Sequence, residues 1–411
     1  MLALWPPPAK AAPGPQLPHS IEALFQYNKA ILAAGQTMLA ARRRVAASGL
    51  LPDPAVEATG FLRPIQTRDG PMESQIMLGQ RFPLWGTLRR ERGVAALRAE
   101  MSAEDLQQLK VEAVFQLNQH WARYLRLTRS LEILGEYRSG LGSFRQAALA
   151  HYSTGGGLTQ HPILKLQIEM SLVESQMNTL SSELESAVNG LQALYDGHFS
   201  PEVVGEDGEI VLPGPSAEEW LERAEGGHPL LVKARQRRQI ATLRHELAVR
   251  KAYPNLVAGV TYTAVGPTEL AGAVSPGGDA LGIKLGLNLP LWFRGNRARV
   301  GAALSEVDAQ LATIEDTWNG IERDVRSAKK QLDELQATHR LYSESLLREA
   351  EQMLSSAHAA YETDRISFLD LLDSERMVKQ VRLDFEAVKA DRRIARARLL
   401  RAAGLYLLEE E

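Results

Sequence analysis

The sequence predicts a mostly α-helical protein with a small β part, built as a tandem repeat of helix, strand, strand, long helix and helix. Three observations predict this fold class. One stretch of sequence occurs twice, each copy ends a run of alternating apolar and polar residues, and each copy opens a long heptad pattern. The 411 residues carry a formal net charge of −3 and contain no cysteine. This composition excludes disulfides and thiol catalysis, and it gives no electrostatic argument for a nucleic-acid partner.

The repeated stretch reads MLGQRFPLWGTLRRERGVAAL in the first copy and KLGLNLPLWFRGNRARVGAAL in the second. Trp85 and Trp292 are 292 − 85 = 207 positions apart. Identical residues coincide with this offset at Leu78, Gly79, Pro83, Leu84, Trp85, Arg90, Arg92, Ala95, Ala96 and Leu97 of the first copy. We therefore expect a proline-rich tail at 1–18, a first repeat at 19–197, a Gly/Pro/Glu-rich connector at 198–227, a second repeat at 228–405 and a tail at 406–411.

The first residues, MLALWPPPAKAAPGPQLP, lack the apolar core that a signal peptide requires. They contain Ala9-Lys10-Ala11, a small-x-small pattern of the kind found at cleavage sites. Two interpretations stay open, namely the remnant of an export signal and a simple proline-rich tail. The sequence contains no apolar run of about 18 residues, so no transmembrane helix is expected.

Strict alternation predicts a strand in the second copy. Leucine and isoleucine occupy every second position from Leu281 to Leu289, and glycine, lysine and asparagine lie between them. A β-rich segment of similar length, Asn255 to Val265, precedes it across a turn-rich loop, and the first copy has a weaker pair that ends in Ile76, Leu78 and Phe82. The strands have about the 9–11 residues that cross a membrane in a tilted barrel. Four strands leave two unpaired edges, so a membrane barrel would need other subunits, whereas a small soluble sheet packed on helices remains the alternative.

Heptad spacing predicts unusually long helices after each strand pair. The second copy has an apolar seam that begins at Val300 and a proline-free run from Arg294 to about Tyr361, which as a helix would be about 100 Å long. A second seam runs from Val378 to Leu399, so the two helices should form an antiparallel hairpin. The first copy repeats this with a helix over 88–152, a break at STGGGLTQHP and a return helix over 163–194.

These features together resemble the TolC family of outer-membrane efflux channels, over about residues 20–405. The resemblance rests on the tandem repeat, on LNLPLWFRGNR at the strand-to-helix junction and on YETDRISFLDLLDSER at the helical break. It implies a homotrimer in which each chain gives four strands to a twelve-stranded β-barrel in the outer-membrane lipid and helical hairpins to a periplasmic α-barrel tunnel. The implied partners are a periplasmic adaptor protein and an inner-membrane pump of the RND or ABC type, in a Gram-negative cell.

The repeated Pro-Leu-Trp is expected at the membrane interface. Pro83 and Pro290 lack an N–H and can end a strand ladder. Trp85 and Trp292 combine an apolar ring with a polar N–H, which favours the membrane–water boundary, although a single tryptophan would more simply be a core residue. Both tryptophans should lie at one height.

The resemblance also assigns a gate. Asp370 and Asp373 match its two gate aspartates, and copies around an axis would form acidic rings that favour cations. Ser367 and Asp370 have the spacing of a capping box, which is the simpler structural explanation. Tyr361 occupies the gate tyrosine position, and His161 stands where the family often has aspartate. We hypothesise a pH-sensitive contact between Tyr361 and His161, against the alternative of a solvated loop histidine.

The two hairpin tips are expected to dock the adaptor, again by resemblance. The tip residues are Gly155, Gly157, Leu158 and Thr159 in the first repeat and Arg365, Ile366 and Ser367 in the second. The glycine run has no following Lys-Ser/Thr and no preceding strand, so it is not a phosphate loop.

No catalytic, metal-binding or cofactor-binding motif emerges, so an enzyme is not expected. The function that the sequence favours is an outer-membrane channel of a tripartite efflux or type I secretion system. The alternative is a soluble coiled-coil scaffold or adaptor with a small sheet. The cargo stays open among metals, drugs and peptides.

Overall fold

A computed structural model describes residues 17–153, 160–199, 216–268, 274–363 and 365–406. The chain forms two compact units. Unit 1 comprises Met1–Ala34, Leu106–Pro229 and Trp318–Glu411, and unit 2 comprises Gly35–Asp105 and Leu230–Thr317. Residues 1–16 of the tail predicted at 1–18 and residues 154–159 of the first hairpin tip lie outside the described residues, and a helix already begins at Leu17.

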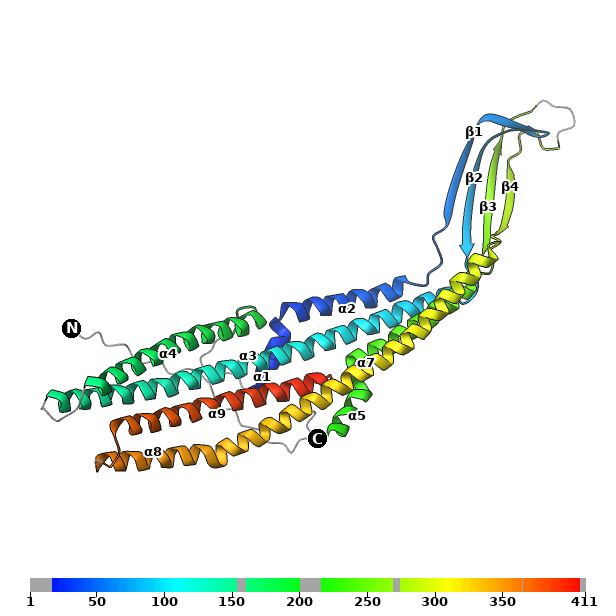
Figure 1. The fold of residues 1–411 in the computed structure, drawn as a ribbon. Helices are drawn as coiled ribbons and strands as arrows, with labels where there is room; N and C mark the ends of the chain where they lie inside the picture. Colours follow the sequence, from blue (N-terminus) through cyan, green and yellow to red (C-terminus); the bar gives the residue numbers. More distant parts are fainter. Residues whose placement is uncertain (1–16, 154–159, 200–215, 269–273, 364, 407–411) are drawn as a thin grey trace, which may run out of the picture. The chain divides into compact units, whose positions relative to one another are not determined.

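The order of elements confirms the predicted fold class (Figure 1). The first half of the chain contains α1 (Leu17–Tyr27), α2 (Lys29–Ala47), β1 (Ala55–Thr67), β2 (Gly70–Phe82), α3 (Thr87–Ser153) and α4 (Gln160–Leu194). The second half contains α5 (Ala217–Gly227), α6 (Pro229–Arg250), β3 (Leu256–Val265), β4 (Ala280–Leu287), α7 (Phe293–Leu341), the π-helical η1 (Tyr342–Leu346), α8 (Leu347–Glu362) and α9 (Phe368–Ala402).

Two local features differ from the sequence-based expectation. Helix α5 lies within the range expected to be a connector, and a capping box begins it, since Ser216 Oγ accepts from the Glu219 N–H at 3.2 Å. The long helix of the second half is interrupted by η1, where the i→i−4 ladder loosens for one turn. Heptad spacing does not reveal such an insertion, because the apolar residues on either side keep their helical period.

Unit 2 contains one four-stranded antiparallel sheet in the order β1-β2-β3-β4 (Figure 1). A turn connects β1 to β2, β3 pairs with β4 from Leu256–Leu287 to Thr263–Ala280, and β2 pairs with β3 in continuous register from Ser74–Ala264 to Phe82–Leu256. The register of β1 with β2 shifts between Gly60 and Ile65, near Pro64, which cannot donate to a ladder. The two halves of the chain thus share a single sheet.

Unit 1 is a helical bundle whose core joins α3, α4 and α9. Its cluster contains fully buried leucines from each helix, Leu134 and Leu141 of α3, Leu166 of α4 and Leu372 of α9. Helices α8 and α9 form an antiparallel hairpin, as expected (Figure 1). A second cluster packs α1 against α3 and the end of α4, around Leu24 and Leu191.

Within the part of the chain that the structure describes, no helix is both long enough and apolar enough to cross a membrane.

Candidate functional site

The sheet of unit 2 has two chemically opposite faces. Residues paired across an antiparallel ladder point to the same side, and successive residues along a strand point to opposite sides. One register row joins Val56, Leu78, Val260 and Ile283, all of which are exposed. The adjacent row joins Glu57, Met77, Thr261 and Gly282. A shift of one residue therefore changes a wholly apolar row into one that contains the polar side chains of Glu57 and Thr261.

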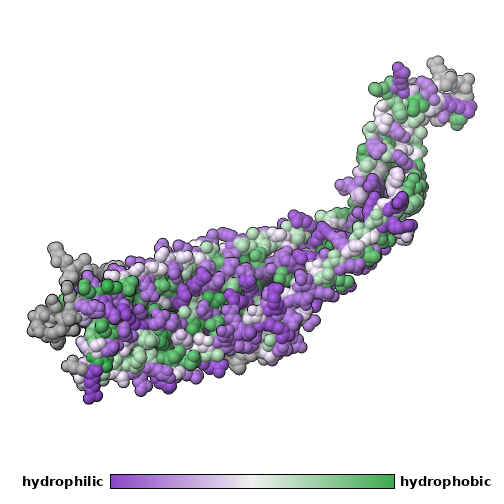
Figure 2. Space-filling view, viewed as in Figure 1, coloured by the Kyte–Doolittle hydropathy of each residue, from purple (hydrophilic) through white to green (hydrophobic). Residues whose placement is uncertain are grey.

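The apolar face continues along the strands. Two further rows lie on the same face, one toward each end of the strands. One joins Ile76, Tyr262 and Leu281, and the other joins Phe82, Leu256 and Leu287. The β4 side chains are the most exposed, with Leu281, Ile283 and Leu285 at 76%, 83% and 72%. Figure 2 shows hydrophobic side chains at the surface over the strand-bearing unit. Soluble monomers seldom expose a contiguous apolar surface of this kind. Such a surface indicates contact with lipid or with another protein.

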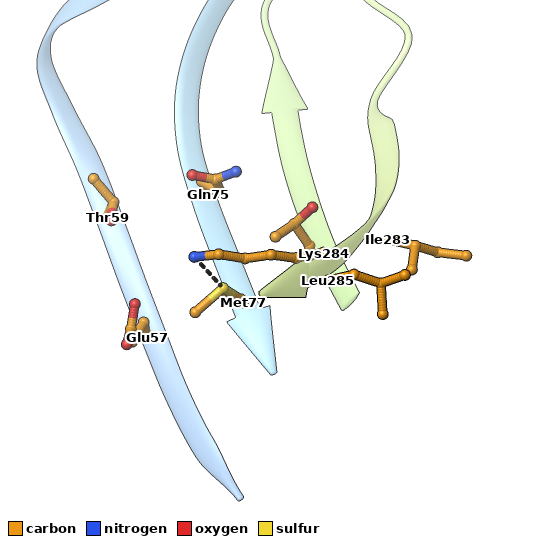
Figure 3. Close-up of a pocket in the computed structure, with 8 residues that line it drawn as sticks. Glu57, Thr59, Gln75, Met77, Ile283, Lys284 and Leu285 are labelled. Atoms are coloured by element: carbon orange, nitrogen blue, oxygen red, sulfur yellow. Dashed lines mark hydrogen bonds between the residues drawn. The ribbon is translucent and has the colours of Figure 1, made fainter. Parts of the chain in front are cut away.

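The polar face carries a shallow hollow, shown in Figure 3. Lys284 extends from β4 across the sheet, and its Nζ lies 3.4 Å from the Met77 Sδ on β2. Ile283 and Leu285 point away from this amine. The Lys284 stem can lie flat because its register row continues through Gly259 and Gly79. The hollow is lined by Glu57, Thr59, Gln75, Met77, Thr261, Ile283, Lys284 and Leu285.

Both outer strands have an unpaired edge in the described structure. Strand β1 pairs only with β2, and β4 pairs only with β3. Backbone N–H and C=O groups along those two edges have no ladder partner from the described chain. An apolar face together with open edges is typical of a sheet that pairs with another chain.

The two Pro-Leu-Trp motifs follow strand ends that lie in one row. Phe82 ends β2, Leu287 ends β4, and both align through Leu256 of β3. Trp85 and Trp292 come shortly after these ends and are 92% and 81% exposed. Pro83 immediately follows β2, as expected for a residue that ends a ladder.

A network of hydrogen bonds stabilises the segment between β2 and α3, which contains the first Pro-Leu-Trp motif. The Leu84 N–H donates to Asn255 Oδ1 at 3.1 Å, and Arg250 Nη1 donates to the Trp85 carbonyl at 2.7 Å. Gly86 turns the chain into α3 at a φ of +82°, a region that favours glycine. Because these contacts engage the backbone, the indole of Trp85 stays free to face outward.

The second hairpin tip begins with the expected capping box. Ser367 Oγ accepts from the Asp370 N–H at 3.3 Å, and the Asp370 carboxylate accepts from the Ser367 N–H at 2.9 Å. The hydrogen bonds from the Ser367 hydroxyl and backbone lower the pKa of Asp370 below its usual value. Asp370 is exposed, so the cap and a negative surface charge coexist at one residue. Arg365 is exposed and Ile366 is half-buried beside it.

Tyr361, Asp373 and His161 have separate surroundings. The ring of Tyr361 lies 6.2 Å from that of Phe368, edge to face, within the aromatic contacts that close the tip. Asp373 is exposed and pairs with Arg376 at 3.3 Å. His161 is exposed on the first turn of α4, and the described structure records no contact between it and Tyr361. The structure thus brings Tyr361 and the two aspartates onto one hairpin end.

A buried ionic cluster was missed by the sequence analysis. Glu169 of α4 is only 4% exposed, and it contacts Tyr137 of α3 together with Arg376 and Lys379 of α9. The only sequence signal was that Arg376 follows Asp373 by three residues, one helical turn. The cluster combines residues far apart in sequence, so spacing could not find it.

The described residues contain no group of three or more side chains suited to hold a metal ion.

Several solved structures of bacterial membrane proteins share this fold. A membrane protein from Pseudomonas aeruginosa superposes with a TM-score of 0.78 at 18% identity, covering 95% of this chain and 90% of that chain. The outer membrane protein VceC of Vibrio cholerae gives a TM-score of 0.76 at 18% identity, covering 94% of this chain and 96% of that chain. The outer-membrane channel OprN gives a TM-score of 0.76, also at 18% identity, over 94% of this chain and 89% of that chain. The fold is therefore the one that these membrane proteins share.

Sequence similarity points to the same class. Residues 220–405 match the family described as outer membrane efflux protein. The cobalt-zinc-cadmium resistance protein CzcC of Cupriavidus metallidurans is 24% identical over 225 residues, which are 54% of this chain. The match spans about half of that relative's length, 51%. These findings confirm the resemblance to outer-membrane efflux channels, whose family and fold are those of transport proteins.

Proposed function

We propose that the chain is one subunit of an outer-membrane channel that conducts substrates from an inner-membrane pump to the exterior, in a tripartite efflux or type I secretion system. The single observation that carries the proposal is the alternation of chemistry between adjacent register rows of the sheet. The row of Val260 would face lipid, and the row of Thr261 would face a water-filled lumen.

The open edges support a homotrimer. A four-stranded sheet is too narrow to close on itself, and unpaired backbone groups are costly in lipid. Three copies would supply twelve strands, with β4 of one subunit pairing with β1 of the next. Three sets of α3/α4 and α8/α9 hairpins, with α7 leading into α8, would continue the pore as a tunnel through the periplasm. A soluble scaffold offers no reason for an exposed apolar face on the sheet.

The strand ends support an interfacial role for the tryptophans. Trp85 and Trp292 follow strand ends in one register row and expose their rings. We place both, with Pro83 and Pro290, at the periplasmic rim of the barrel, where an indole can combine apolar contact with a hydrogen bond.

The tip of the α8/α9 hairpin is the proposed gate. Asp370 and Asp373 are exposed there, so three copies brought around an axis would give acidic rings that attract cations. Tyr361 closes the same end through Phe368, and His161 is its proposed pH-sensitive partner across the hairpins. The adaptor would dock at Arg365, Ile366 and Ser367 and at the first tip. The first cargo to test is a divalent metal cation, because the relative CzcC is named for cobalt, zinc and cadmium resistance.

Conductance across a planar lipid bilayer tests this function. The refolded protein should form discrete, cation-preferring channels, and Asp370→Asn and Asp373→Asn should each reduce the cation preference measured as a reversal potential. If no preparation forms channels, the proposed function is wrong. If channels form and both variants keep the wild-type reversal potential, only the gate assignment is wrong.

A further inference from the structure

The Glu169 cluster has a geometry that the channel function does not by itself require. Glu169 lies on α4 with its carboxylate in the core of unit 1. Its Oε1 accepts a hydrogen bond from the Tyr137 hydroxyl of α3 at 2.9 Å and lies 3.7 Å from Lys379 Nζ of α9. Its Oε2 accepts from Arg376 Nη2 of α9. One carboxylate therefore joins three helices from both halves of the chain.

This carboxylate is charged at neutral pH despite its burial. Burial raises the pKa of Glu169, but the bonds from Arg376 and Tyr137 and the two cationic neighbours outweigh it, so the pKa lies below its usual value. Lys379 also lies over the Tyr137 ring, 4.7 Å from its centroid, which keeps the ammonium in place. Separating α9 from α4 would leave a buried charge without its main partner, which is strongly unfavourable.

Arg376 also contacts one of the proposed gate acids. While Nη2 donates to Glu169, Nη1 donates to Asp373 Oδ1 at 3.3 Å, on the same helix. A guanidinium has a planar set of donors and can serve two carboxylates at once, which a lysine cannot do in the same way. The orientation of Asp373 is therefore linked, through one side chain, to a fixed point inside the bundle.

We propose that Glu169 and Arg376 form an anchor that holds α9 against α4 and fixes Asp373 in the closed arrangement of the gate. Both are positioning residues, since they act through Asp373. The inference rests on the proposed channel function. In it, opening is resisted by a contact within one subunit, between the α3/α4 hairpin and the α8/α9 hairpin. Glu169 lies about two helical turns beyond His161 on α4.

A second ion pair between α9 and α3 provides a matched control. Arg382 contacts Glu136 at 3.2 Å and also Glu351 of α8 at 3.3 Å, and the two glutamates are 70% and 57% exposed, against 6% for Glu169. Arg382 likewise joins helices of unit 1, but both of its acidic partners are exposed, and exposed pairs contribute little. Loss of charge on α9 is the same in both variants, so a difference between them reports the buried anchor.

The test is single-channel recording of Glu169→Gln, Arg376→Gln, the double variant and Arg382→Gln, each purified as the assembled protein. Glu169→Gln and Arg376→Gln should each raise the open probability at least about tenfold, because each removes one partner of a buried pair from the closed state. The double variant should add little to either single one, since both remove the same coupling. Arg382→Gln should stay near wild type.

Arg376→Lys separates anchoring from positioning. It keeps a cation for Glu169 but should lose the simultaneous contact to Asp373, so it should alter the reversal potential of the open channel with a smaller rise in open probability. If Glu169→Gln does not assemble, Tyr137→Phe removes one donor from the same carboxylate and should raise open probability by a smaller factor.

The anchor is refuted if wild type conducts while the Glu169, Tyr137 and Arg376 variants keep its open probability. An equal rise in Arg382→Gln also refutes it. Absence of conductance in wild type would instead refute the channel function itself, so the two failures are distinguishable.

Discussion

Arginine placed at two neighbouring positions of β3 distinguishes the lipid face of the sheet from the lumen face. Val260 is near the middle of β3, 47% exposed, in a row with Leu78 and Ile283 on its two neighbouring strands. Thr261 is the next residue and points to the opposite side, in the row of Met77. We predict that Val260→Arg prevents stable insertion into the outer membrane and that Thr261→Arg does not.

The magnitude follows from the position in the bilayer. An arginine on the lipid face of a barrel costs about 2–4 kcal/mol at the midplane, which is about 30-fold to about 700-fold in partitioning. The same arginine at Thr261 would project into water beside polar side chains and cost little. In a soluble protein both positions would be water-exposed, and each change would stay within about 0.5 kcal/mol.

The assay compares the two variants during refolding into lipid vesicles and in the outer-membrane fraction of expressing cells. Circular dichroism of the helices checks that both chains fold. Equal insertion of both variants would refute the assignment of the faces, and selective failure of Thr261→Arg would reverse it.

Three further predictions concern the helical unit, and thermal unfolding measures each of them. Leu372 is fully buried between α3, α4 and α9, so Leu372→Ala should cost about 2–5 kcal/mol. Gly404 ends α9 at a φ of +77°, and an added Cβ would lie 2.9 Å from His228 Cδ2, so Gly404→Ala should cost more than about 1 kcal/mol, whereas a loss of under 0.5 kcal/mol would contradict the contact. Burial lowers the pKa of His228 to about 4, while a hydrogen bond with the Ala402 backbone partly opposes this shift. As the pH falls, His228 therefore becomes protonated near pH 6.5 in the unfolded chain but only near pH 4 in the folded protein. The free energy of unfolding should decrease between these two pH values by up to about 3 kcal/mol. His228→Asn should remove this part of the pH dependence.

Periodic segments were predictable from sequence because their signals are local. The alternation from Leu281 to Leu289 predicted β4 within one or two residues at each end, and the heptads predicted α3 and the α8/α9 hairpin. The capping box at Ser367 was also visible, since it depends on residues three positions apart. The β1 strand was harder to define, because Pro64 and the irregular pairing after Gly60 break its alternation.

The candidate site was only partly accessible from the same signals. Asp370 and Asp373 followed from the motif at the helical break, but whether they act as a gate remains a prediction. The sequence analysis did not single out Arg376, because a heptad does not reveal which neighbouring helix a polar side chain will contact. Its contact with Glu169 spans 207 positions in sequence.

By itself the sequence determined β4, the long helix α3 and the α8/α9 hairpin, and which residues of these elements share a face, because these depend on periods of two and 3.6 residues along a single element. Only the tertiary structure decided that β2 lies beside β3, so that two short hairpins become one sheet with a continuous apolar face. It alone decided that a glutamate of α4 is buried against α9. Both results depend on contacts between distant segments, where packing and the pairing of buried charge select one arrangement among many that the same local pattern permits.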